Sequence, residues 1–179
     1  AVEKQLEICD KIGVGVAGVL MEPIQGEAGA LVPPDDFWPR IRAATKHHGT
    51  LLIADEVQTG LGRTGKLWGV DHWNVIPDIL AVAKSLGGGV MPVSAFCSTE
   101  EIWQCMMYPN PFIHTTTTGG GALACSAAIA SINVVLRDDY PKQAAEKGSY
   151  FIAKLEALAK EYPQIYREIT GRGLLIGQH

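Results

Sequence analysis

Short apolar runs alternate with amphipathic segments along the chain. The runs at residues 14–22, 50–57 and 78–84 have the length and the bounding turn residues of buried strands. Residues 37–48 place apolar side chains at helical spacing, and Gly49 follows as a helix-ending residue. This alternation predicts an α/β domain with a mostly parallel sheet and helices on both faces.

The second half of the chain is richer in helical patterns. Residues 93–98 and 112–118 are further strand candidates, and residues 99–107 between them predict a short helix capped by Thr99. The remaining predicted elements are helices at 122–139 and 141–162 and a final strand introduced by Gly171 and Gly173.

Composition excludes several classes of protein. With 47% hydrophobic and 19% charged residues the chain is too apolar to be disordered, and its 15 basic residues are scattered among 19 acidic ones. A net charge of −4 without a basic patch argues against nucleic acid or an anionic membrane as a partner. The longest apolar run, residues 14–21, is too short to span a bilayer.

The cysteines and the chain ends add two expectations. The four cysteines lack the spacing of a zinc site or a disulfide framework, which predicts no metal, a reducing compartment and a cytoplasmic location; they are Cys9, Cys97, Cys105 and Cys125. The chain begins with Ala and stops inside an apolar run, so we expect it to be a fragment.

Two predicted strands end in residues that can carry chemistry. Asp55 and Glu56 end one strand and Lys84 ends the next, and ligands bind at the carboxyl ends of parallel strands. We therefore expect the two ends to face one cleft, with a carboxylate that needs partners and a poorly hydrated lysine suited to nucleophilic attack. The alternatives are an acidic residue that caps the following loop and a lysine whose ammonium reaches water.

A glycine pattern suggests nucleotide binding but fits it poorly. Gly60, Gly62 and Gly65 match G-x-G-x-x-G, and with Lys66 they almost complete a phosphate-binding loop. A dinucleotide site needs a helix that opens at the third glycine, whereas the residues that follow lack helical periodicity. Leu67 stands where a hydroxyl must hold magnesium. Both nucleotide interpretations are therefore disfavoured.

Four ordered motifs resemble the class III, fold type I, pyridoxal 5'-phosphate-dependent aminotransferases. They are EPIQGEAGALVPP, LLIADEVQTGLGRTGKLWG, PDILAVAKSLGGGVMPVSA and HTTTTGGGALA. The resemblance covers essentially the whole chain. It implies an incomplete major domain of that fold, with residues 1–140 from the large cofactor-binding domain and residues 141–179 from the start of the small C-terminal domain.

The resemblance also implies roles for individual residues. Lys84 matches the lysine that binds the cofactor covalently, and Asp55 matches the carboxylate that keeps the pyridine nitrogen protonated. Val57 matches the apolar residue that packs under the ring, and Gln58 matches the side chain near the ring hydroxyl. Glu27 matches a glutamate at the substrate entrance.

Thr117 matches the threonine that reaches the cofactor phosphate of the neighbouring subunit, which implies a homodimer or a higher homo-oligomer. The alternative is one polar residue in a Thr-rich strand. Residues 118–122 depart from the family pattern, because Thr-Gly-Gly-Gly-Ala stands where an aromatic residue, two glycines, Asn and Pro are usual.

The function implied is transfer of an amino group from an amine to a 2-oxo acid such as 2-oxoglutarate. The sequences PNPFIHTTT and GGGVMP resemble members that use a diamine such as putrescine. The alternatives are an acetylornithine, ornithine or other class III aminotransferase, a fold type I decarboxylase or aminomutase that keeps Lys84 and Asp55, and a truncated, inactive folded domain. We expect the fragment alone to be inactive, since the family's upstream phosphate-binding loop has no counterpart here.

Overall fold

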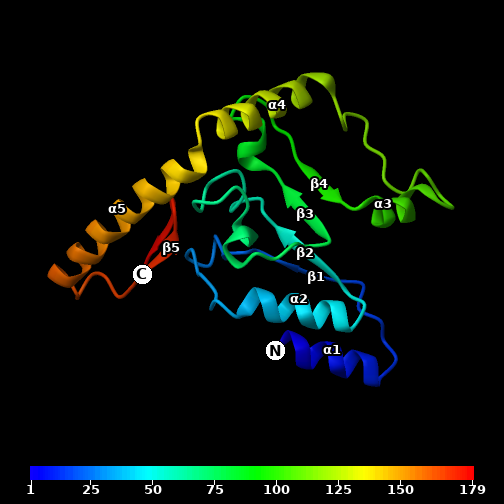
Figure 1. Cartoon of the computed structure of the whole chain (residues 1–179), viewed down its shortest axis with the longest axis horizontal. Coiled ribbons are helices and arrows are strands. Elements are labelled where there is room, and N and C mark those ends of the chain that lie inside the picture. The colour runs from blue at the N-terminus through cyan, green and yellow to red at the C-terminus, as the bar shows by residue number, and fades with distance from the viewer.

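A four-stranded sheet forms the centre of the structure, a computed structural model that describes residues 1–179 (Figure 1). Its strands follow one another in chain order across the sheet: β1 (Gly18–Met21), β2 (Leu51–Asp55), β3 (Ile79–Val82) and β4 (Ala95–Ser98). β1, β2 and β3 are parallel, and β4 runs antiparallel to β3. The predicted mostly parallel sheet is confirmed, and the carboxyl ends of its first three strands lie at one edge.

The main core lies between this sheet and the helix α2 (Phe37–His47). Leu52 and Ala54 of β2 are fully buried against Trp38 of α2, whose indole Nε1 donates a hydrogen bond to the Pro23 carbonyl oxygen at 3.2 Å. Side chains alternate between the faces of a strand, so Asp55 points away from α2. On the outer side of α2 lies α1 (Val2–Lys11) (Figure 1).

Beyond β3 the chain forms a short 3-10 helix, η2 (Lys84–Gly87), on which α4 (Ala122–Arg137) packs. The Ser131 hydroxyl of α4 donates a hydrogen bond to the Ser85 carbonyl oxygen at 3.0 Å. α5 (Tyr140–Glu161) follows α4, and no helix of the structure has both the length and the apolar character needed to cross a membrane. The division into domains at residue 140 stays a prediction.

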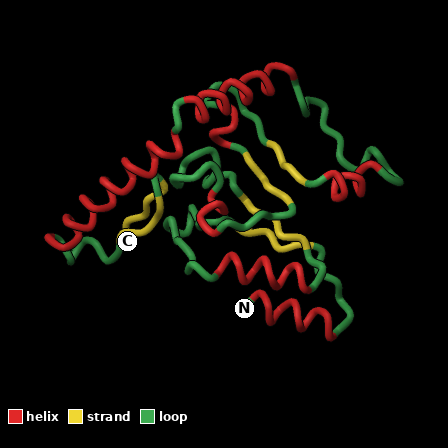
Figure 2. The backbone as a smooth tube through the Cα atoms, viewed as in Figure 1, coloured by secondary structure: helices red, strands yellow, loops and turns green.

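A small hairpin of β5 (Ile169–Arg172) and β6 (Leu175–Gln178) packs beside α5 (Figure 2). The final strand predicted after Gly171 and Gly173 is present as β6, whereas the sequence did not predict its partner β5. Gly171 lies inside β5, and Gly173, with φ 57°, forms the turn that reverses the chain. A left-handed φ of this kind favours glycine and allows a tight hairpin turn.

Residues 112–118 do not form the strand that the sequence predicts. The helix before them, α3 (Glu100–Met107), is confirmed together with its cap, because the Thr99 hydroxyl accepts a hydrogen bond from the Ile102 N–H at 3.4 Å. Residues 108–121 are turns and irregular backbone, every one exposed, and extend away from the sheet (Figure 1). A Thr-rich run has strand propensity, but no partner strand lies beside it to pair with.

Candidate active site

Asp55 and Lys84 lie at the ends of neighbouring parallel strands. Asp55 is the last residue of β2 and pairs with Ala81 of β3, and Lys84 follows three positions later as the first residue of η2. Lys84 has φ 47°, a conformation that residues with a side chain rarely adopt, at the turn where the chain leaves the sheet. The structure thus places both residues at one edge of the sheet.

The two side chains have different surroundings. Asp55 is half-buried, and its Oδ1 accepts a hydrogen bond from the Val57 N–H at 3.0 Å, while Oδ2 has no hydrogen-bond partner. Lys84 is exposed and forms no ion pair or hydrogen bond. The expectation of a poorly hydrated lysine is therefore not met, since the Lys84 side chain is exposed although α4 packs on η2.

Asp55 lines a cavity of about 510 Å³ that Lys84 does not share. The cavity lies beside β1, where Leu20 is 62% exposed. The loop that leads to α2 also lines it. It opens on the β1 side of β2, whereas Lys84 follows β3 on the other side. Asp55 and Lys84 thus share a sheet edge, and the single cleft expected between them stays a prediction.

Glu56 is the buried carboxylate of this region. It is 1% exposed and accepts hydrogen bonds from the Thr59 hydroxyl, from the Gly69 N–H at 2.8 Å and from the Val70 N–H at 2.9 Å. The sequence predicts that a carboxylate at this strand end is buried with partners, and the structure identifies it as Glu56 rather than Asp55. Its role was missed, although the alternation of residues along β2 placed it on the core side.

The glycine-rich turn after β2 is built around this carboxylate. A Cβ on Gly69 would lie 2.8 Å from the Cβ atoms of both Pro23 and Thr59, so only glycine brings this N–H to Glu56 without displacing a neighbour. The turn leads into a five-residue 3-10 helix, η1 (Gly69–Trp73). The sequence predicts that no α-helix begins at Gly65, and the structure has none there.

Burial raises the pKa of Glu56 above its ordinary value of 4.5, against the lowering effect of the hydrogen bonds from Thr59, Val70 and Gly69. A raised folded-state pKa means that the folded protein binds the proton more tightly, so the pH-dependent part of the stability from Glu56 is present below pH 4.5 and is lost as pH rises through the raised pKa. We expect the free energy of unfolding of the wild type, minus that of Glu56→Gln, to fall over this range in urea titrations. A difference that grows with pH would show that the hydrogen bonds outweigh burial.

Two of the predicted site residues are in direct contact. The Gln58 side-chain Nε2 donates a hydrogen bond to Glu27 Oε1 at 2.7 Å. Gln58 is half-buried just after β2, and Glu27 is exposed on the loop between β1 and α2. The tip of this loop is held by the C-terminal hairpin, since the Thr170 hydroxyl donates to the Gly29 carbonyl oxygen at 2.6 Å. His179 Nε2 lies 3.0 Å from the same oxygen.

The other predicted residues are less closely grouped. Val57 is half-buried and touches the site through its N–H, which binds Asp55. Thr117 is exposed within residues 108–121, and no hydrogen bond joins it to the rest of the site. The structure therefore forms two hydrogen-bonded pairs, Asp55 with Val57 and Gln58 with Glu27, and leaves Thr117 apart from both.

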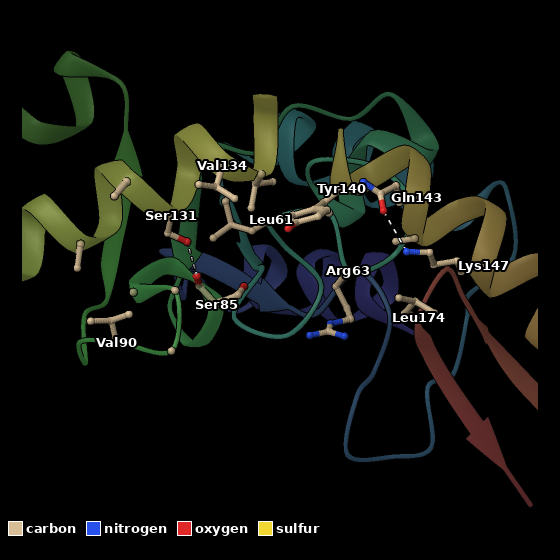
Figure 3. A pocket seen from close by; sticks show the side chains of 18 residues that line it. Leu61, Arg63, Ser85, Val90, Ser131, Val134, Tyr140, Gln143, Lys147 and Leu174 are labelled. Carbon is tan, nitrogen blue, oxygen red and sulfur yellow. Dashed lines mark hydrogen bonds between the residues drawn. The ribbon is translucent and has the colours of Figure 1, made fainter. Parts of the chain in front are cut away.

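A second cavity, of about 830 Å³, lies between η2, α4 and the start of α5 (Figure 3). Ser85, Ser131 and Tyr140 are among its lining residues, and Lys147 Nζ donates to Gln143 Oε1 at 3.0 Å on its α5 side. None of the predicted site residues lines this cavity, although Ser85 directly follows Lys84. It is separate from the cavity that Asp55 lines.

Comparison with known proteins gives the family. A sequence model of the class III aminotransferases matches residues 2–179. A putrescine aminotransferase of Pectobacterium atrosepticum is 50% identical over 175 residues, which cover 98% of this chain and 37% of the relative. The chain thus spans little more than a third of the length of that relative.

Solved structures agree with the sequence comparison. An ornithine aminotransferase of Plasmodium yoelii is 38% identical with a TM-score of 0.86, over 97% of this chain and 44% of its own. An aminotransferase of Bacillus anthracis is 30% identical with a TM-score of 0.89, over 98% of this chain and 40% of its own. The fold, the ordered motifs and these matches agree, and the chain belongs to the class III aminotransferase family.

Proposed function

We propose that this protein transfers an amino group from an amine to a 2-oxo acid with the help of pyridoxal 5'-phosphate. The observation that carries the proposal is the placement of Asp55 and Lys84 at the carboxyl ends of adjacent parallel strands, where ligands of such sheets bind. Family membership supports the same reaction class.

The groups at this sheet edge fit the cofactor chemically. Asp55 Oδ2 is an acceptor without a partner, as a protonated ring nitrogen requires, and the exposed Lys84 amine is free to bind an aldehyde carbon. An ornithine aminotransferase of Toxoplasma gondii is described with partial occupancy of pyridoxal phosphate at its active site. When bound, the cofactor supplies an electron sink for the carbon next to the reacting nitrogen.

Two side chains of this chain then move or hold protons. Lys84 Nζ would hold the cofactor through its aldehyde carbon, and the Lys84 amine, once free, would take the proton from the donor carbon and deliver it to the cofactor. The Asp55 carboxylate holds a proton on the ring nitrogen through its negative charge. We assign Val57 to the apolar contact under the ring and Gln58 to the ring hydroxyl.

The proposed active enzyme is a homodimer or a higher homo-oligomer. We assign the Thr117 hydroxyl to the cofactor phosphate of a neighbouring subunit, which accords with its exposed position away from the contacts of Asp55. We also propose a cytoplasmic location, supported by the four cysteines, all of which are free thiols.

The proposed donor is a diamine such as putrescine, with 2-oxoglutarate as the acceptor. The support is the 50% identity to a putrescine aminotransferase, compared with 38% to the ornithine aminotransferase of P. yoelii. Glu27 at the entrance adds a carboxylate, whose charge suits a cationic substrate better than an anionic one.

Chemical labelling tests the proposal directly. Full-length protein is incubated with pyridoxal 5'-phosphate, reduced with borohydride and mapped by peptide mass spectrometry. We expect the label on Lys84, because only this amine stands at the strand end beside Asp55, and we expect it to be lost in Lys84→Ala. A label on Lys66 or Lys46 instead would overturn the assignment, and no label would favour an inactive folded domain.

A further inference from the structure

Gly26 leaves the space that the Gln58 side chain occupies. A Cβ built on Gly26 would lie 2.6 Å from the Gln58 side-chain amide carbon, 3.0 Å from its Nε2 and closer still to its Oε1. Such contacts are shorter than van der Waals packing allows. Any side chain at residue 26 therefore displaces the Gln58 amide, or is itself displaced.

The backbone at Gly26 is the less mobile of the two groups. Its N–H donates a hydrogen bond to Glu22 Oε2 at 2.9 Å, and its carbonyl oxygen accepts from the N–H groups of Gly29 and Ala30 at 3.0 and 3.1 Å. Gln58, by contrast, meets Gly26 with the end of a flexible side chain. In an alanine variant it is Gln58 that moves.

The Gln58 amide in this position makes one side-chain hydrogen bond, to Glu27. Gln58 itself is half-buried just after β2. The bond occupies Glu27 Oε1 and leaves Oε2 free toward solvent. Displacing the amide would release the Glu27 carboxylate to rotate. Gly26 would thereby alter Glu27 without touching it.

We propose that Gly26 is a positioning residue for substrate binding: by lacking a Cβ, it lets Gln58 hold the Glu27 carboxylate in a fixed orientation. The inference rests on the proposed function, in which Glu27 meets the incoming amine and Gln58 lies near the cofactor. It extends that function because Gly26 would set the position of Gln58, and Gln58 would set the orientation of the Glu27 carboxylate.

The substitution Gly26→Ala tests whether Gly26 positions Glu27 or only supports the fold. The clash falls on a flexible side chain and Gly26 does not need a left-handed φ, so the fold is retained. We expect the KM for a diamine to rise roughly 3- to 10-fold, the range that corresponds to the loss of one hydrogen bond. Gly15→Ala is the matched control, since a Cβ there meets nothing within 4 Å.

A double-mutant cycle in the full-length enzyme gives the decisive comparison. Gln58→Ala removes the amide that the new methyl group would meet, so Gly26→Ala should raise the KM in the wild type but add nothing further in the Gln58→Ala background. Equal effects of Gly26→Ala in both backgrounds would overturn the proposal, and so would a wild-type KM in Gly26→Ala.

A readout independent of catalysis separates this inference from the proposed function. In the 179-residue chain, the side-chain amide NMR signal of Gln58, assigned by its absence in Gln58→Ala, should shift in Gly26→Ala and stay in place in Gly15→Ala. An unshifted signal refutes the positioning role even if the enzyme transaminates. A shifted signal in the 179-residue chain, together with a full-length protein that neither binds pyridoxal phosphate nor transaminates, supports the contact and refutes the proposed function.

Discussion

The substitution Asp55→Asn in the full-length protein is expected to lower kcat roughly 100- to 1000-fold while leaving cofactor binding partly intact. Asn keeps the shape of Asp and can still accept the Val57 N–H at the strand end, but it carries no charge. A carboxylate shifts the pKa of a neighbouring cation by about 1–3 units, and losing two to three units at the ring nitrogen corresponds to this change in rate.

Steady-state assays and absorbance spectra of the bound cofactor measure the two effects separately. Asp35→Asn is the control, because its side chain is 94% exposed. It should keep wild-type turnover. Wild-type turnover in Asp55→Asn would refute the role assigned to Asp55, and complete loss of the cofactor would show that the carboxylate mainly holds it in place.

The substitution Glu56→Ala is expected to lower the free energy of unfolding by about 3–5 kcal/mol. It removes the acceptor of the Gly69 and Val70 N–H groups and of the Thr59 hydroxyl, all of them buried, and each unsatisfied polar group costs about 1–3 kcal/mol. Urea denaturation at neutral pH measures the loss.

An exposed glutamate on α5 provides the comparison for this experiment. Glu156→Ala removes a solvent-exposed carboxylate with no hydrogen-bond or ion-pair partner, so it should change stability by no more than about 0.5 kcal/mol. A loss below about 1 kcal/mol for Glu56→Ala would mean that water or a rearranged turn satisfies the freed N–H groups. The carboxylate would then not organise the turn.

The strands of the central sheet were predictable because each is a compact apolar run bounded by turn residues. The order of motifs also placed Asp55 and Lys84 at neighbouring strand ends, since one connection joins β2 to β3. The run at residues 112–118 has the same local composition as a strand but lacks a neighbour to pair with. Local propensity carries no information about that neighbour, and the prediction was wrong there.

The contacts within the site were harder to predict than its members. Glu56 binds N–H groups 13 and 14 positions later, and Gln58 binds Glu27 across 31 positions. These contacts depend on the path of two loops, which the hydrophobic pattern does not describe. Alternation along β2 indicated only that Glu56 faces the core, and nothing in the sequence indicated that Gly26 makes room for Gln58.

The contacts between the β5–β6 hairpin and the loop at Gly29 affect the order of folding. Thr170 and His179 reach the Gly29 carbonyl oxygen across 141 and 150 positions of sequence. Because a ribosome delivers a protein from its N-terminus, the tip of this loop cannot be fixed before Thr170 and His179 have emerged. The strands β1, β2 and β3 precede both residues, so the sheet core can assemble before the tip of the loop that carries Glu27 is fixed.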